Sequence, residues 1–96
     1  MNIFVLHEDP RIAAQMACDQ HVVKMPTETA QMLSIVWQDQ PVRPHLAYAP
    51  TTMHVKHPCT LWIGASTGNY AWAVEHGIAL CEEHGYRYPD NPVHAA

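Results

Sequence analysis

The stretch of residues 19–33, DQHVVKMPTETAQML, constrains the fold of this chain more than any other segment. At 100° per residue on a helical wheel, its polar side chains gather within an arc of about 80°, and its apolar side chains lie on the adjoining side. The pattern predicts an amphipathic helix with one polar face. The four residues of this polar arc are His21, Lys24, Glu28 and Gln31.

The chemistry of the polar arc makes it a candidate site. An imidazole, an amine, a carboxylate and an amide are groups from which proton-transfer and carbonyl chemistry are built. The alternative is an ordinary solvated helix face, stabilised by an i,i+4 pair between Lys24 and Glu28.

Capping residues and prolines indicate where the first two helices begin. Asp9 and Pro10 predict the N-cap and first residue of a short helix over residues 10–17. Asp19 is expected to cap a second helix, residues 20–38. A proline inside this second helix removes one hydrogen bond and costs roughly 3 kcal/mol, which predicts either a kink or a restart.

The second half of the chain carries similar signals. His57-Pro58 opens a helical segment, Gly64 interrupts it, and Ser66 or Thr67 can restart it. An apolar stripe at helical spacing then runs toward the glycine at position 85, and its first residue is expected in the core. The stripe consists of Tyr70, Val74, Ile78 and Cys81.

These elements together predict the fold. Residues 39–56 contain three prolines and little periodicity, so we expect a loop there. Residues 2–6 are expected to form a short arm or a small strand, and residues 85–96 an extended tail. The sequence therefore predicts a small all-α single domain, residues 1–96, with about three main helices and a short N-terminal arm.

Composition limits the classes of function. With 96 residues, of which 48% are hydrophobic, the chain can form a modest core, and we expect its active site to be an open groove. No apolar run could span a bilayer, and no signal-peptide pattern is present. Three cysteines without CxxC spacing agree with a cytoplasmic location and reduced thiols. A net charge of −4 with five Lys and Arg argues against tight, sequence-independent DNA binding.

Two pairs of residues have a spacing that zinc ligands can use. His54 and His57 form one pair, and Cys81 and His84 form the other. Neither pair is an established metal motif, and a chain with eight histidines produces such spacings by chance. We therefore expect no metal and no cofactor.

Motifs in order along the chain resemble the pyrimidine-dimer DNA glycosylase family, which includes phage-type endonuclease V and small bacterial relatives. The resemblance covers about residues 3–88 and implies a compact helical protein that kinks DNA and flips a base out of the stack. The motifs are Asp19-x-His21, Lys24, Glu28, Gln31-x-Leu33, His57-Pro58 followed by Trp62, and GIALCEEHGYRY.

The resemblance also implies a mechanism. In this family the N-terminal α-amine attacks C1′ of the damaged nucleotide, and a glutamate on the first long helix assists sugar-ring opening and elimination. The glutamate falls on Glu28. Because Asn2 disfavours removal of the initiator methionine, the amine falls on Met1, and an α-amine with a pKa of about 7.7–8.0 supplies free base at neutral pH. Lys24, one turn before Glu28, is the alternative nucleophile.

Five residues are candidates for substrate binding. His21 could bind a phosphate or act as an acid, or could be an ordinary helix or core histidine. Trp62 could stack on an exposed base, and His57 is expected to cap a helix that faces the site. Arg87, between two tyrosines, could pair with a phosphate or pin the C-terminal segment to the core. Gln31 completes the set through its place in the polar arc.

Three functions remain open at this point. The leading hypothesis is a DNA-base-processing enzyme, a glycosylase with an abasic-site lyase step, that uses Glu28 and a nearby amine on damaged or modified duplex DNA. The second is an enzyme on the same scaffold that acts on a free nucleotide or a modified base, which the negative charge suits better. The third is a non-enzymatic binding module, metal-stabilised or not, whose polar arc forms a protein interface.

Overall fold

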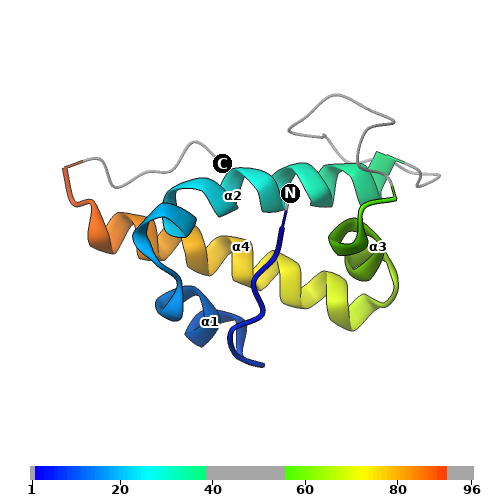
Figure 1. The fold of residues 1–96 in the computed structure, drawn as a ribbon, viewed down its shortest axis with the longest axis horizontal. Coiled ribbons are helices and arrows are strands. Elements are labelled where there is room, and N and C mark those ends of the chain that lie inside the picture. Colours follow the sequence, from blue (N-terminus) through cyan, green and yellow to red (C-terminus); the bar gives the residue numbers. More distant parts are fainter. Residues whose placement is uncertain (1, 39–55, 91–96) are drawn as a thin grey trace.

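The computed structural model describes residues 2–38 and 56–90, and this part of the chain is built from helices (Figure 1). No strand occurs within the described residues, so the predicted all-α fold is confirmed, and residues 2–6 form an extended arm. The predicted loop over 39–55 and the last residues of the tail, 91–96, lie outside the described residues. The helices are α1 (Pro10–Met16), α2 (Asp19–Gln38), α3 (Pro58–Gly64) and α4 (Thr67–Arg87).

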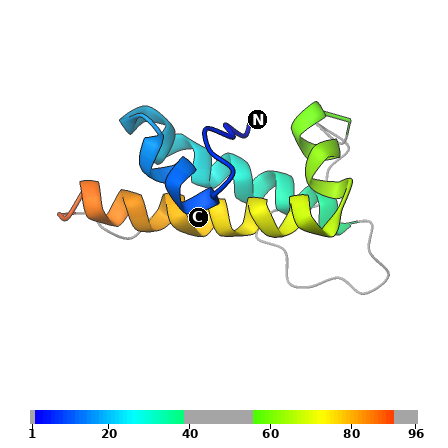
Figure 2. The same ribbon diagram turned by 90° about the horizontal axis from the view of Figure 1, so that it is seen from below.

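Two long helices, α2 and α4, form the body of the structure. They lie side by side and run in opposite directions (Figures 1 and 2). The short helix α1 packs on α4, and α3 packs against both long helices. None of the described helices combines the length and apolarity that a membrane crossing requires.

The helix starts follow the capping signals in the sequence. The side chain of Asp9 accepts hydrogen bonds from two backbone N–H groups of α1, at 2.9 and 3.4 Å. His57 accepts the N–H of Cys59 through Nδ1 at 3.1 Å, and Ser66 accepts the N–H of Asn69 through Oγ at 3.0 Å. Each contact satisfies a donor that a helix start leaves without a helical partner, so these three predicted caps are confirmed.

The helix α2 continues through Pro26 without a restart. Because proline has no N–H, the carbonyl of Val22 does not receive the usual helical hydrogen bond from position 26. The proline ring is buried, and packing of this turn offsets the lost hydrogen bond. Asp19, expected as the cap, is instead the first residue of α2, where its carboxylate favours the positive end of the helix dipole.

The core consists of two clusters, and the N-terminal arm contributes to both. Phe4 packs against the first cluster and Ile3 packs against the second. The first cluster comprises Ala14, Ala17, Val22, Met25, Ala79 and Leu80. The second is formed by Met32, Ile63 and Ala73, with partly buried neighbours that include Trp62 and Tyr70.

The apolar stripe predicted on α4 does not form its buried face. Ile78 is 50% exposed, and Tyr70 is only half-buried against the second cluster. The arm and α1 pack on another side of α4, and the face turned toward them carries small and imidazole side chains that periodicity does not single out. The buried residues of α4 are Ala73, His76, Ala79, Leu80 and His84.

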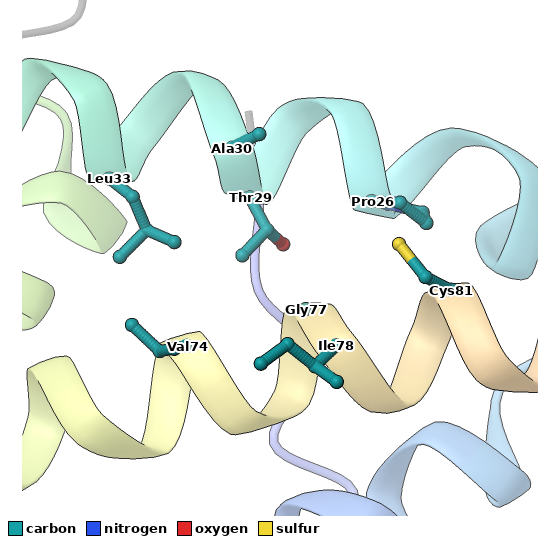
Figure 3. A pocket seen from close by; sticks show the side chains of 8 residues that line it. All are labelled: Pro26, Thr29, Ala30, Leu33, Val74, Gly77, Ile78 and Cys81. Carbon is teal, nitrogen blue, oxygen red and sulfur yellow. The ribbon is translucent and has the colours of Figure 1, made fainter. Parts of the chain in front are cut away.

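Val74, Ile78 and Cys81 of the stripe instead line an apolar groove of about 170 Å³ between α2 and α4. Figure 3 shows Leu33 and Pro26 of α2 across the groove from Val74 and Cys81 of α4. The two helices approach closely at the floor of this groove. A Cβ atom added to Gly77 would lie only 3.2 Å from Cγ2 of Thr29. The absence of a side chain at this position therefore sets how near α4 lies to α2.

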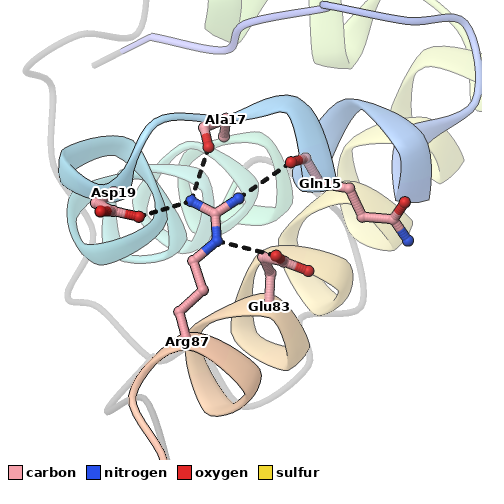
Figure 4. Close-up of polar contacts among 5 residues, drawn as sticks. All are labelled: Gln15, Ala17, Asp19, Glu83 and Arg87. Carbon is pink, nitrogen blue, oxygen red and sulfur yellow. Dashed lines mark hydrogen bonds and ion pairs between the residues drawn. The ribbon is translucent and has the colours of Figure 1, made fainter.

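Arg87 fastens the end of α4 to the corner between α1 and α2 (Figure 4). Its guanidinium donates to the carbonyl oxygens of Gln15 at 3.0 Å and Ala17 at 2.8 Å. It also donates to the carboxylates of Asp19 at 3.0 Å and Glu83 at 2.9 Å. Four of its five N–H donors are thus engaged, and of the two roles expected for Arg87, these contacts fit the one that pins the C-terminal segment.

The same contacts explain a correction at the tail. Residues 85–87, expected to begin an extended segment, belong to α4, which ends only at Arg87. A glycine at position 85 weakens a helix by roughly 1 kcal/mol relative to alanine, and the hydrogen bonds of Arg87 to charged and carbonyl groups exceed that cost.

We expect Arg87→Lys to lower the free energy of unfolding by about 1–3 kcal/mol, because an ammonium cannot form the same fork of hydrogen bonds. Arg11, which forms an exposed ion pair with Glu82 at 2.8 Å, offers a matched control. Arg11→Lys should leave the stability nearly unchanged. Urea unfolding followed by circular dichroism measures both variants, and equal losses would contradict the role given to Arg87.

Candidate active site

The continuous helix α2 places the polar arc on one face of the protein. His21, Glu28 and Gln31 are half-buried, whereas Lys24 is exposed. Because no restart breaks the helix, Glu28 lies about two turns after His21 and within about 20° of it around the helix axis.

Phe4 of the N-terminal arm covers His21. The two rings are stacked, with centroids 4.2 Å apart and planes inclined by 5°. Both side chains are half-buried. The arm therefore contacts the polar face of α2 at its N-terminal end.

The start of the arm reaches toward the middle of α2. Ile3 packs against the core cluster formed by Met32 of α2, Ile63 of α3 and Ala73 of α4. Figure 1 shows the arm, in dark blue, leading from near the middle of α2 to α1. Phe4 thus contacts α2 at His21, and Ile3 contacts the core where α2, α3 and α4 meet.

Two side chains of α4 bind the backbone where the arm leads into α1. Nε1 of Trp72 donates to the carbonyl oxygen of Glu8 at 2.7 Å, and Nδ1 of His76 donates to that of Pro10 at 3.2 Å. The rings of Trp72 and His76 stack at 4.7 Å, and Trp62 meets Trp72 edge-on at 5.9 Å. Trp62 of α3 and Trp72 and His76 of α4 therefore form a continuous row of ring contacts.

A second apolar groove, of about 260 Å³, opens between the arm and α3. Trp62, which is half-buried, forms part of its lining. Val5 and Leu61 are large apolar residues of the arm and α3 that are 53% and 56% exposed. The groove is lined by Ile3, Val5, Pro58, Cys59 and Trp62.

The structure separates the predicted site residues into groups. The polar arc remains together on α2, and His57 caps α3, whose side chains line the groove beside the arm. Arg87 is engaged at the far end of α4. Met1 lies outside the described residues.

The residues considered for zinc do not assemble a site in the described part of the chain. No group of three or more His, Cys, Asp and Glu residues converges among residues 2–38 and 56–90. His54 lies outside these ranges. Burial, and to a smaller extent the charge of Glu82, raises the pKa of the Cys81 thiol, which works against the thiolate that zinc requires.

His76 is the buried titratable group closest to the arm. It is 3% exposed, and this burial lowers its pKa below the ordinary 6.5, an effect partly offset by the hydrogen bond with the carbonyl of Pro10. The neutral imidazole is therefore the form that the folded protein favours.

Of the residues that hold the arm, Phe4 and His76 did not emerge as site residues from the sequence. Phe4 lies in the apolar run NIFVL, and Trp72 and His76 lie four residues apart on α4. That spacing indicates a shared helix face. It does not reveal that the face meets the backbone of the arm.

This fold and geometry define a small helical protein in which an N-terminal arm packs on a helix that carries a glutamate. The family model for pyrimidine dimer DNA glycosylase matches residues 1–95, and the chain belongs to this family. The membership supports a DNA glycosylase that acts in DNA repair, with DNA as its substrate. Neither a curated protein nor a solved structure was found to match the chain.

The depressed pKa of His76 predicts a pH dependence of stability. Below about pH 6.5 the unfolded chain binds a proton that the folded protein disfavours, so stability falls as the pH falls through this value. His76→Asn keeps an N–H donor near the Pro10 carbonyl and removes the titration. Urea midpoints between pH 7.5 and 5 should decline less steeply for the variant, whereas parallel declines would contradict this assignment.

Proposed function

We propose that this protein is a DNA glycosylase with abasic-site lyase activity, which acts through a Schiff base between the α-amine of Met1 and the sugar. The amine nitrogen attacks C1′, the bond from C1′ to the base breaks, and the base leaves with the bonding electron pair. The attached nitrogen then loses a proton, the C1′–O4′ bond breaks as O4′ takes up a proton, and the sugar ring opens to an imine. Loss of a proton from C2′ with cleavage of the C3′–O3′ bond then releases the 3′ phosphate. Glu28 takes and returns the protons in these steps.

The observation that carries this proposal is the contact of the N-terminal arm with α2, the helix that bears Glu28. Phe4 stacks on His21 before Glu28, and Ile3 packs against the Met32 cluster after it. The stack of Phe4 on His21 thus ties the arm to the helix that bears the carboxylate, and the chain start is covalently joined to Ile3 and Phe4 through Asn2. The arrangement supports an α-amine and a proton-transfer group acting together.

The environment of Lys24 supports the α-amine over the lysine as nucleophile. Catalytic lysines are activated by burial or by neighbouring cations. Lys24 is exposed and lies one turn from the carboxylate-bearing Glu28, so neither condition is met among the described residues.

The groove beside the arm supports binding of an exposed base. Its wall of Ile3, Pro58 and Trp62 is apolar and includes an indole, and nucleobases stack on aromatic side chains. We place Trp62 in base binding, Gln31 in hydrogen bonding to the substrate, and His57 in orienting α3.

A second candidate function follows from the charges. Among the described residues, Arg11 pairs with Glu82, and Arg87 pairs with Asp19 and Glu83. Such a surface offers few cations to DNA phosphates, which favours weak, salt-sensitive binding of duplex DNA. An enzyme that acts on a free nucleotide or a modified base would need fewer cations.

The role of Glu28 is tested by Glu28→Gln on a duplex that carries either a pyrimidine dimer or an abasic site. The variant should bind the duplex as the wild type does but cleave it at least about a hundredfold more slowly, because an amide cannot exchange the proton. Glu75→Gln, which makes the same charge change at an exposed position of α4, is the control.

Single-turnover strand cleavage measures the rate, and fluorescence anisotropy measures binding. Equal cleavage by Glu28→Gln and the wild type would remove Glu28 from the mechanism. Cleavage of neither duplex by the wild type, with turnover of a free modified nucleotide, would favour the second candidate.

A further inference from the structure

We infer that Phe4 is a positioning residue, which fixes the N-terminal arm on α2, the helix that bears Glu28, by stacking on His21. The inference rests on the proposed function for its catalytic consequence. Its structural content, that this stack orders the arm, is independent of any reaction.

The geometry of the stack is specific to a planar ring. A centroid distance of 4.2 Å with planes inclined by 5° lets the face of Phe4 cover the imidazole. Phe4 also packs against the first core cluster, which contains Val22 and Met25 on the adjoining side of α2. The ring is thus held by α2 from two sides.

The rest of the arm offers few other anchors. Val5 and Leu6 are 53% and 45% exposed, and the backbone bond from the N–H of Leu6 to the carbonyl of Phe4, at 3.0 Å, is local. The next described tether to α4 is the hydrogen bond at Glu8. Phe4 and Ile3 are therefore the arm residues that can fix the register of the chain start along α2.

Register matters because the proposed nucleophile is attached to the arm. A reacting group displaced by about 1 Å can lose on the order of 10²-fold in rate. His21 lies on the same helix face as Glu28. Because both residues belong to one continuous helix, a ring stacked on His21 keeps a fixed position relative to the carboxylate of Glu28. In this view the imidazole acts as a platform for the arm.

The test compares variants that keep or remove the ring. Phe4→Leu fills similar space without a planar face and should slow single-turnover borohydride trapping on an abasic duplex at least about tenfold, with duplex affinity unchanged within about twofold. Phe4→Tyr keeps the ring and should recover most of the rate. Leu6→Ala, a truncation in the same arm at an exposed position, should trap at the wild-type rate.

A double-mutant cycle separates a platform from a proton donor. Phe4→Leu and His21→Ala remove the same stack, so the double variant should trap no more than about twofold more slowly than the slower single variant. Rate losses that multiply would show that His21 acts on its own, and would overturn the platform role.

Arm order supplies a readout that needs no reaction. Backbone ¹⁵N relaxation should give order parameters near 0.85 for residues 3–5 in the wild type and below about 0.6 in Phe4→Leu. An equally ordered arm in Phe4→Leu would overturn the inference, even if the wild type traps DNA. If the wild type traps no DNA but the arm is less ordered in Phe4→Leu, the proposed function would be contradicted and the structural role of Phe4 would stand.

Discussion

The close packing of α2 on α4 is the constraint on which the rest of the structure depends. The two helices meet where Thr29 lies against Gly77, a position at which a Cβ would come within 3.2 Å of the threonine methyl group. This contact turns one side of α2 toward α4. The polar arc consequently lies away from the α4 groove, on a face that the arm can cross.

The arm converts this helix face into a candidate site. Trp72 and His76 of α4 bind the backbone where the arm leads into α1, Phe4 stacks on His21 of α2, and Ile3 packs against the second core cluster. A segment without helix or strand is thereby fixed by side chains from both long helices. A site formed in this way needs no enclosed chamber, which suits a chain of 96 residues.

The sequence predicted what depends on local chemistry and missed what depends on distant neighbours. The caps at Asp9 and His57 are set within a few residues, and both were predicted. The sequence left open whether Pro26 kinks or interrupts α2, because the outcome depends on the burial of the proline in the folded protein. Periodicity placed Ile78 on an apolar stripe but could not show that arm and α1 cover a different face of α4. The role of Phe4 depends on its contact with His21, seventeen positions later in the chain, and no pattern in the sequence of the arm predicts this contact.

The identity of the trapped amine tests the account most directly. Borohydride reduction of the protein on an abasic duplex, followed by tryptic digestion and mass spectrometry, should place the adduct on the N-terminal peptide, residues 1–11. Acetylation of the α-amine should abolish the adduct. An adduct on Lys24 that survives acetylation would contradict the central claim, and an adduct on neither amine would exclude imine chemistry at this site.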